Sequence, residues 1–429
     1  MRISTLQAFN NGVAGLQRNY ANATRTQEQI STGNRILTPA DDPVASVRLL
    51  QLEQQQNVLG QYNSNLTAAK NSLTQEEVTL NSVNTVLHRV RELALQAGNG
   101  ALDPQDRKSI AAELREREDE LLSLMNTRNA RGEYLFSGFQ GKTQPFVRTA
   151  DGSYRYEGDE GQRKLQIASS LSIPISDNGK SVFQSVINAG RLDSDFTSKP
   201  VGSTLALSTP LVQDEVAFAA NFPPEGVEIE FAADGSTYSI YALPRDPGND
   251  PLPKGDGLKL DDDPDSSDKL VVGGVALHFG GQAVGGERLV VVPGIITDIA
   301  ADGTVTTKPV ENKQGILDTI ANLRSALENP SNSNNGIRDA VAVALTNLDH
   351  GMVSVDAARG NIGARLNIIE TTMTDNEDVA LVNKSVQAEL RELDYAEALS
   401  RLSFQTVILE AAQQSYVKIS GLNLFNAMR

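Results

Sequence analysis

The three histidines are the residues best suited to acid-base or metal chemistry, and they lie far apart in the sequence. His88, His278 and His350 do not form the HExxH pair that places two metal ligands on one helical face. His88 falls within a predicted long helix, where an ordinary surface position is much more common than a catalytic one. The chain has no cysteine, which excludes disulfides, thiolate metal sites and cysteine nucleophiles.

Two further motifs could bind an ion or a nucleotide, and neither has the required spacing. An acidic run offers oxygen ligands for calcium but lacks the Gly and Glu positions of an EF-hand loop. It consists of Asp261, Asp262, Asp263, Asp265 and Asp268. The glycines of "VVGGVALHFGGQAVGG" match neither a Walker loop nor a Gly-rich turn that opens a helix. We therefore expect no enzyme activity, no cofactor and no metal.

Composition limits the partners of this 429-residue chain. Its 54 acidic and 38 basic residues give a net charge of -16, which repels phosphate backbones and anionic bilayers. We therefore expect no nucleic-acid partner. No apolar run approaches the roughly 20 residues of a membrane span, and the start has no long apolar region of a signal peptide. We expect neither membrane insertion nor a cleaved signal.

Both ends of the chain carry a helical stripe with a seven-residue repeat. The first consists of Leu6, Phe9, Val13, Leu16, Tyr20, Ala23, Gln27 and Ile30. The second consists of Tyr395, Leu402, Leu409 and Tyr416, with Ala398, Ala412 and Ile419 three residues behind and Gln405 as the exception. Gly12 and Gly15 weaken the first helix by about 1 kcal/mol each. Such marginal helices are typical of segments that become ordered against neighbouring subunits.

The stretch "STGNRILTPADDPVAS" interrupts the first helix and starts a second one. Gly33 or Asn34 can take the left-handed conformation that ends a helix. Asp42 can accept hydrogen bonds from the next turn, and Pro43 suits the first helical position. Leucines seven apart then predict a helix from Pro43 to about Ala97, and another helix begins at Asp103 and Pro104 and runs back antiparallel.

The periodicity predicts a mainly α protein with a β-rich insert, in which long N- and C-terminal helices pack as a coiled-coil rod. Short strand-like runs fill the insert, including "VEIEF" and "TYSIYAL", which predict a hairpin around Asp234 and Gly235. Helical spacing returns from Ile316 to Leu327 and from Val341 to Met373. We expect a terminal domain of residues 1–42 and 375–429, a helical domain of 43–150 and 304–374, and a β-rich outer domain of 151–303.

Several motifs resemble the bacterial flagellin family. They are "QEQISTGNRILTPADDPVAS", "GNIGARLNIIE" and "LDYAEALSRLSFQTVILEAAQQSYVKISGLNLFNAMR". The segments "MRISTLQAF", "NARGEYLFSGF" and "SYVKISGLNLFN" are more similar to the branch of the family that joins hook and filament than to filament flagellin. The resemblance implies a structural subunit that is exported through the flagellar type III apparatus, is cytoplasmic before export and ends in the extracellular flagellum, where filament attachment requires it.

The resemblance also implies partners and site residues. The partners would be copies of the chain in a ring, an adjoining hook-associated protein, filament flagellin, and a cytoplasmic export chaperone at the C-terminal helix. The subunit interface would comprise Leu6, Phe9, Val13, Leu16, Tyr20, Ile30, Tyr395, Leu402, Leu409, Tyr416, Ile419, Leu424 and Phe425. A spoke between inner and outer tubes would comprise Gly33, Arg35, Asp41, Asp42 and Pro43. The alternatives are filament flagellin, and a secreted adhesin or hydrolase with its active surface in the insert.

Overall fold

The computed structural model describes residues 2–245, 251–252, 257–259, 268–299 and 305–427, without the side chains of residues 2–6, 8, 268, 297–299, 305–306 and 419–427. The helices are α1 (Arg2–Thr32), α2 (Pro43–Ala97), α3 (Pro104–Met125), a π-helical turn η1 (Lys180–Gln184), α4 (Glu215–Asn221), α5 (Ile316–Glu328), α6 (Asn334–Arg391) and α7 (Tyr395–Ala427). Within these residues, no helix combines the length and the apolar character that a membrane span needs.

The strands are short and lie between α3 and α5 in the sequence. They are β1 (Phe146–Arg148), β2 (Tyr154–Tyr156), β3 (Lys164–Gln166), β4 (Ser172–Pro174), β5 (Val186–Ile187), β6 (Leu192–Ser198), β7 (Ala206–Leu207), β8 (Leu211–Val212), β9 (Val227–Phe231), β10 (Thr237–Ala242), β11 (Leu258–Lys259), β12 (Asp268–Val272), β13 (Val275–Gly280), β14 (Arg288–Pro293), β15 (Ile295–Ile299), β16 (Val305–Pro309) and β17 (Lys313–Gln314). The predicted fold class, mainly α with a β-rich insert, is confirmed.

The chain divides into two compact units. Unit 1 comprises Met1–Thr67, Gln166–Leu171 and Ile369–Arg429, and unit 2 comprises Ala68–Leu165 and Ser172–Ile368. The boundaries at 67 and 369 fall inside α2 and α6, so they differ from the three domains that the sequence analysis expects. The division into three domains stays a prediction.

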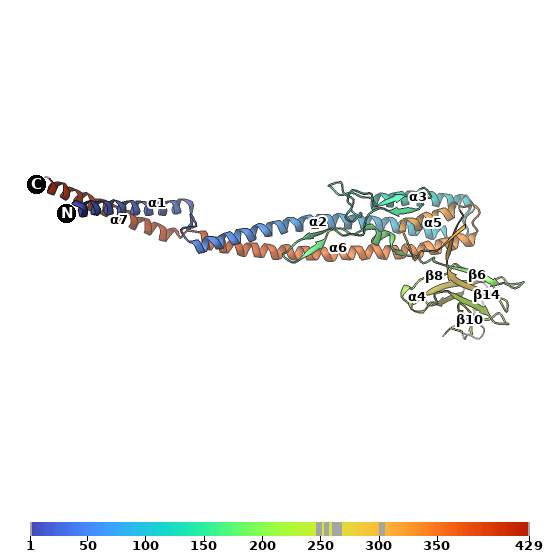
Figure 1. Cartoon of the computed structure of the whole chain (residues 1–429). Helices are drawn as coiled ribbons and strands as arrows, with labels where there is room; N and C mark the ends of the chain where they lie inside the picture. The colour runs from blue at the N-terminus through green and yellow to red at the C-terminus, as the bar shows by residue number, and fades with distance from the viewer. Residues whose placement is uncertain (1, 246–250, 253–256, 260–267, 300–304, 428–429) are drawn as a thin grey trace. The chain divides into compact units, whose positions relative to one another are not determined.

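In unit 1, α1 lies beside α7, and the first part of α2 belongs with the last part of α6 (Figure 1). Polar side chains are among its buried residues. The amide of Asn376 donates to Asn63 Oδ1 at 3.2 Å, and Thr26 and Asn383 are also buried. Since fewer large apolar side chains are buried here, we expect the helices of unit 1 to be less stable than those of unit 2.

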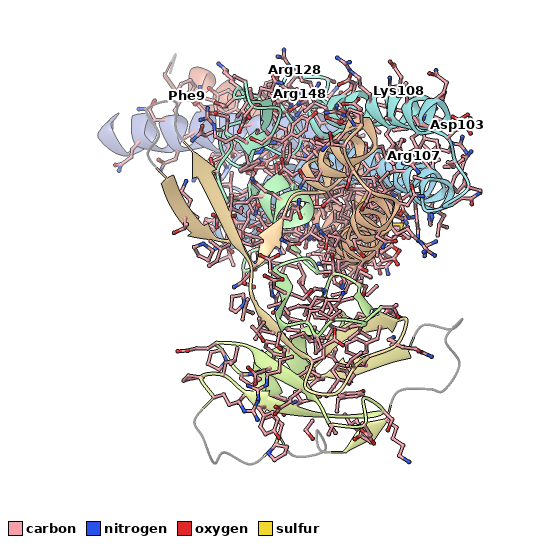
Figure 2. All side chains as sticks on the ribbon, turned by 90° about the vertical axis from the view of Figure 1, so that its right-hand side faces the viewer. Phe9, Asp103, Arg107, Lys108, Arg128 and Arg148 are labelled. Atoms are coloured by element: carbon pink, nitrogen blue, oxygen red, sulfur yellow. The ribbon has the colours of Figure 1, made fainter. Side chains whose placement is uncertain are left out.

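In unit 2, the predicted leucine stripe of α2 is fully buried: Leu73, Leu80 and Leu87 each have 0% exposure. Helix α3 runs back antiparallel to α2, as predicted, because Arg89 Nε donates to Glu113 Oε1 at 2.8 Å and Gln75 donates to the carbonyl of Arg128 further along. Asp103 begins α3 as predicted, since its side chain accepts hydrogen bonds from the first helical amides (Figure 2).

A buried carboxylate holds the first strands against the helices of unit 2. Glu118 of α3 has 0% exposure and accepts from Arg148 at 2.6 Å and from Arg324 Nε at 2.9 Å. The hydroxyl of Tyr154 also donates to it. Two guanidinium groups and a phenol therefore compensate one buried charge and tie β1, β2 and α5 to α3.

Of the remaining strands, three pairs, β3 with β4, β5 with β17 and β15 with β16, form separate two-stranded sheets, and the others form two larger sheets with one apolar core. The five-stranded sheet has the order β11-β10-β9-β14-β6, and β13 of the other sheet pairs with β12, β7 and β8. The predicted hairpin is confirmed, because β9 and β10 pair antiparallel around Asp234 and Gly235. The residues of this core lie between Leu192 and Val291, whereas earlier residues such as Tyr154 contact the helices. Residues 246–250, 253–256 and 260–267 lie outside the described residues, and with them Asp261, Asp262, Asp263 and Asp265 of the acidic run, whereas Asp268 begins β12.

Candidate functional site

The seven-residue stripe of α7 is the face that packs within the chain. Its members Ala398, Leu402, Leu409 and Ala412 are buried or half-buried. The ring of Tyr416 contacts that of Phe9 on α1, with 5.3 Å between centroids. The sequence therefore predicted the stripe, and the structure pairs it with α1 of the same chain.

Two residues of α1 deviate from the predicted stripe. Tyr20 is 64% exposed and Gln27 is exposed, whereas the neighbouring Asn19 is half-buried and Thr26 is buried. The buried and half-buried residues Leu16, Asn19, Ala23, Thr26 and Ile30 keep a seven-residue repeat, but the steps after Leu16 and Ala23 are three residues and not four. The second line of the stripe therefore lies on the other side of the first from the predicted one. Burial of Thr26 is tolerated because its hydroxyl donates to the carbonyl of Asn22 at 3.1 Å.

The other interface candidates divide between half-buried and exposed positions. Val13, Leu16 and Ile30 are half-buried, whereas Phe9 is 49% and Tyr395 is 51% exposed. The side chains of four candidates, Leu6, Ile419, Leu424 and Phe425, lie outside the described residues. The assignment of these residues to a contact between subunits stays a prediction.

A second apolar stripe of α7, which the sequence analysis missed, faces away from the buried one. Phe404, Val407 and Ile408 are 72%, 61% and 43% exposed and lie at i, i+3 and i+4 on one side of the helix. We call these three residues the outer stripe. The signal that could have found it is the run "FQTVIL", where apolar residues occupy positions off the seven-residue line. A row of large exposed apolar side chains on one helix is typical of a docking surface.

Gln405 interrupts the buried stripe of α7 with a polar side chain. Its Oε1 is buried, and no hydrogen-bond partner for this atom is found among the described residues. A buried acceptor without a partner costs about 1–3 kcal/mol. Because of this cost and because Phe9 is half-exposed, we expect the packing of α1 against α7 to contribute little to stability.

The predicted spoke is hydrogen-bonded to the connection between α6 and α7. The amide of Leu393 donates to the carbonyl of Gly33 at 3.0 Å, and the amide of Arg35 donates to the carbonyl of Arg391 at 2.8 Å. The Arg35 guanidinium donates to the carbonyl of Leu390 at 3.0 Å. The two segments that separate the terminal helices from α2 and α6 therefore hold each other.

Gly33 ends α1 as the sequence predicts. Its φ of +70° lies in the left-handed region, and a Cβ there would be 2.9 Å from the hydroxyl of Tyr395. Any other residue would therefore be strained in the backbone and crowded by the ring.

The two aspartates of the spoke fix its far end. Asp41 accepts from the amides of Leu37 and Thr38, each at 2.9 Å, and pairs with Arg25. Asp42 accepts from the amide of Ala45 at 2.9 Å, and Pro43 takes the first helical position. The spoke is thus a specified turn between α1 and α2.

The residues suited to catalysis stay on separate elements. His88 is exposed on α2, His278 is half-buried on β13, and His350 of α6 lies with Nδ1 3.2 Å from the carbonyl of Ile187. Across the described residues, no group of three or more His, Cys, Asp or Glu could hold a metal ion.

The chain is similar to proteins of the bacterial flagellum. A family model described as the bacterial flagellin N-terminal helical region matches residues 3–141. Flagellar hook-associated protein 3 of Salmonella typhimurium is 31% identical over 230 residues, which are 54% of this chain and 70% of that protein.

Two solved structures from Legionella pneumophila have the same fold. The crystal structure of flagellar hook-associated protein 3 matches with a TM-score of 0.61 at 25% identity, over 79% of this chain and 98% of that one. The crystal structure of the flagellar junction protein matches with a TM-score of 0.59 at 26% identity, over 80% of this chain and 99% of that one.

Proposed function

The chain belongs to the family of flagellar hook-associated protein 3, and we propose that it is the structural subunit that joins the hook to the filament. One observation of the structure carries the proposal. The terminal helices α1 and α7 pair through one stripe and leave the outer stripe of α7 exposed. A helix with two apolar faces can pack against its own chain and against a neighbour at the same time.

Copies of the chain in a ring would use the outer stripe for contact. Phe404 and Val407 lie one turn apart, so they can enter the groove of a neighbouring helix together. The weak pairing of α1 with α7, which contains the unpartnered Gln405 oxygen, supports ordering of these helices during assembly. The exposed Phe9 and Tyr20 extend the same proposal to α1.

The spoke would couple movements of the terminal helices to α2 and α6. Its hydrogen bonds join Gly33 and Arg35 to the segment before α7, so both connections would move as one piece. In this proposal, copies of the chain form a ring. An adjoining hook-associated protein lies on one side of the ring, and filament flagellin lies on the other. Neither neighbour needs an enzymatic step from this chain.

Before assembly, the outer stripe would be exposed in the cytoplasm. Exposed apolar stripes aggregate, so we propose that an export chaperone covers α7 until the flagellar type III apparatus exports the chain. A pull-down from cytosol tests this step by comparing the full chain with one that ends at Asn383. Equal chaperone recovery by both chains would contradict it.

Filament flagellin is the less supported alternative, because the curated relative and the two structures named above are hook-associated or junction proteins. A strain without this chain distinguishes the roles under the electron microscope. The junction role predicts an intact hook, no attached filament and filament flagellin released into the medium.

Immunogold labelling gives the matching positive result. The junction role predicts one narrow band of label at the boundary between hook and filament. Label along the whole filament would instead support filament flagellin, and label on the cell surface would support the secreted adhesin or hydrolase.

A further inference from the structure

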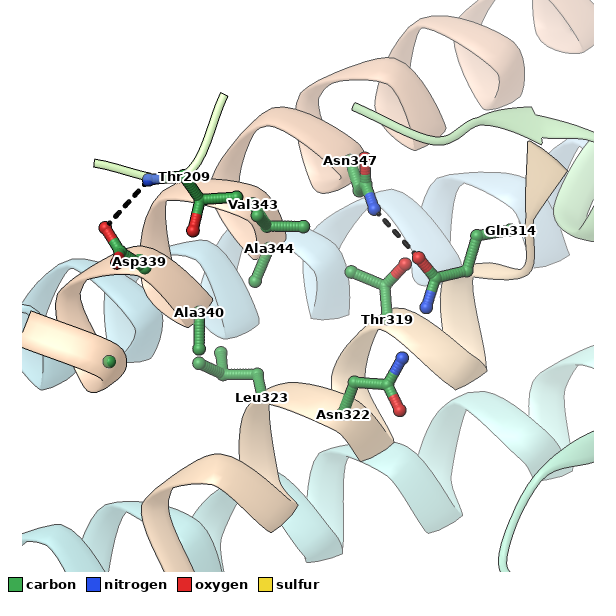
Figure 3. A pocket seen from close by; sticks show the side chains of 11 residues that line it. Thr209, Gln314, Thr319, Asn322, Leu323, Asp339, Ala340, Val343, Ala344 and Asn347 are labelled. Carbon is green, nitrogen blue, oxygen red and sulfur yellow. Dashed lines mark hydrogen bonds between the residues drawn. The ribbon is translucent and has the colours of Figure 1, made fainter. Parts of the chain in front are cut away.

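A cavity of about 310 Å³ lies in unit 2, between α5, the first turns of α6 and the loop that contains Thr209 (Figure 3). This volume is at the lower end of the range for small-ligand pockets, roughly 300–1,000 Å³. The flagellar role proposed above makes no use of it. A carboxylate lines one end of the cavity, apolar side chains line its middle, and side-chain amides line the other end. The order of these groups defines the kind of ligand that would fit.

Asp339 of α6 supplies the charge at one end. Its Oδ1 accepts a long hydrogen bond of 3.3 Å from the amide of Thr209, and the side chain of Thr209 also donates to the carboxylate. Burial raises the pKa of Asp339, although the hydrogen bonds from Thr209 and the charge of Arg338 act in the opposite direction. Within the part of the chain that the structure describes, no lysine, arginine or histidine forms a salt bridge with this carboxylate. A half-buried carboxylate without a cation favours a cationic ligand.

The middle of the cavity is apolar. Figure 3 shows Leu323 of α5 and Ala340 and Ala344 of α6 between the two polar ends. These side chains offer only methyl and methylene groups, and the small alanines leave the space open. An aliphatic chain would fit this section, whereas a second charged group would be desolvated there without compensation.

The other end of the cavity carries hydrogen-bonding groups without charge. Asn347 is held in place, because its amide nitrogen donates to Gln314 Oε1 at 3.1 Å and its oxygen accepts from the amide of Ala189 at 2.7 Å. This bond leaves the Nε2 of Gln314 available as a donor. A ligand carbonyl would therefore find a partner at this end.

We propose that the cavity binds an alkylammonium group with a carbonyl at the opposite end of its aliphatic chain, the chemistry of a lysine side chain with its peptide carbonyl. The protonated amine lies at Asp339, the methylenes lie over Leu323 and Ala340, and the carbonyl accepts from Gln314. The site is independent of the proposed flagellar function. The net charge of -16 also raises the local concentration of cations around the molecule.

A titration of the full chain followed by ligand-observed NMR tests the proposal. The probe is Nα-acetyl-lysine methylamide, and the neutral control is Nα-acetyl-norleucine methylamide, which has the same chain without the amine. We expect saturable binding of the lysine probe in the millimolar range and at least about tenfold weaker binding of the norleucine probe. A free diamine, 1,5-diaminopentane, tests the carbonyl end, because it has the ammonium group and the methylenes without a carbonyl. Weaker binding than that of the lysine probe supports the proposal, and equal or tighter binding contradicts it.

Two variants locate the binding site. Asp339→Asn keeps an acceptor for the amide of Thr209 but removes the charge, and we expect about tenfold weaker binding of the lysine probe. Ala340→Leu fills the middle of the cavity and should abolish binding. Asp375→Asn removes an exposed charge elsewhere on α6 and serves as the control that keeps full affinity.

Four results would overturn the proposal. They are no saturable binding of the lysine probe, equal binding of the norleucine probe, equal or tighter binding of the diamine, and unchanged affinity in Asp339→Asn. Circular dichroism of each variant confirms that the helices are intact, so a loss of binding is assigned to the cavity.

Discussion

Replacement of Phe404 by alanine tests whether the outer stripe assembles the subunits. A phenylalanine side chain can bury on the order of 200 Å², and 72% of Phe404 is exposed in the single chain. Full burial against a neighbour would therefore remove about 140 Å² from water, worth about 3.5 kcal/mol at about 25 cal/mol per Å². Alanine keeps part of this area, so we expect a loss of about 2–3 kcal/mol per contact, or roughly 30- to 150-fold in association.

The effect should be confined to assembly. Most of the Phe404 side chain is exposed in the single chain, so it stabilises the fold of the chain very little. Phe404→Ala should therefore leave the circular dichroism of the purified chain unchanged. In a strain that lacks the chromosomal copy, the variant should support few attached filaments by electron microscopy. In a ring, the loss of binding free energy repeats at each contact between subunits. The number of attached filaments should therefore fall by more than the fold-change in association at a single contact.

Two variants on the same helix serve as controls. Gln413→Ala changes an exposed polar residue and should support normal filaments. Leu409→Ala changes the half-buried stripe and should reduce the helical signal of the chain as well as filament attachment. Normal filament numbers with Phe404→Ala, or a loss of its helical signal, would refute the assignment of the outer stripe.

Three further predictions concern unit 2. Glu118→Gln removes the buried charge that two arginines share, so it should lower the free energy of unfolding by about 2–5 kcal/mol, whereas the exposed Glu120→Gln should change it by less than about 1 kcal/mol; urea unfolding checks both. Burial raises the pKa of Asp318 to about 6, above about 3.9 in the unfolded chain. The folded state then binds the proton more tightly, so its stability contribution is complete below about pH 4 and is lost as pH rises through 6. Asp318→Asn should remove this decline and stabilise the chain at pH 7 by at most about 2–3 kcal/mol, measured as urea midpoints from pH 4 to 7.5. Excision of residues 193–292 should leave the helices of unit 2 folded by circular dichroism and thermal unfolding, because the amide of Gly294 donates to the carbonyl of Arg191 at 2.9 Å and the cut ends are adjacent; loss of the helical signal would contradict it.

The sequence by itself determined where helices begin and end. Asp42 with Pro43 and Asp103 with Pro104 start helices at the predicted residues, and Gly33 ends one in the left-handed conformation. These signals are local, because a cap contacts amides two or three residues away. The leucine spacing of α2 likewise identified its buried face, since a helix places residues seven apart on the same side.

Only the tertiary structure decided what each face contacts. Periodicity indicated that Leu402 and Leu409 would be buried, but the same pattern fits a neighbouring subunit and α1 of the same chain equally well. The connection between Gly33 and Leu393 and the cluster around Glu118 join residues hundreds or dozens of positions apart. The groups that meet at such contacts are fixed by chain topology, and no local pattern of residues encodes their distance. The cavity beside Asp339 likewise depends on the tertiary structure, because it lies where α5 faces the small side chains of Ala340 and Ala344 on α6.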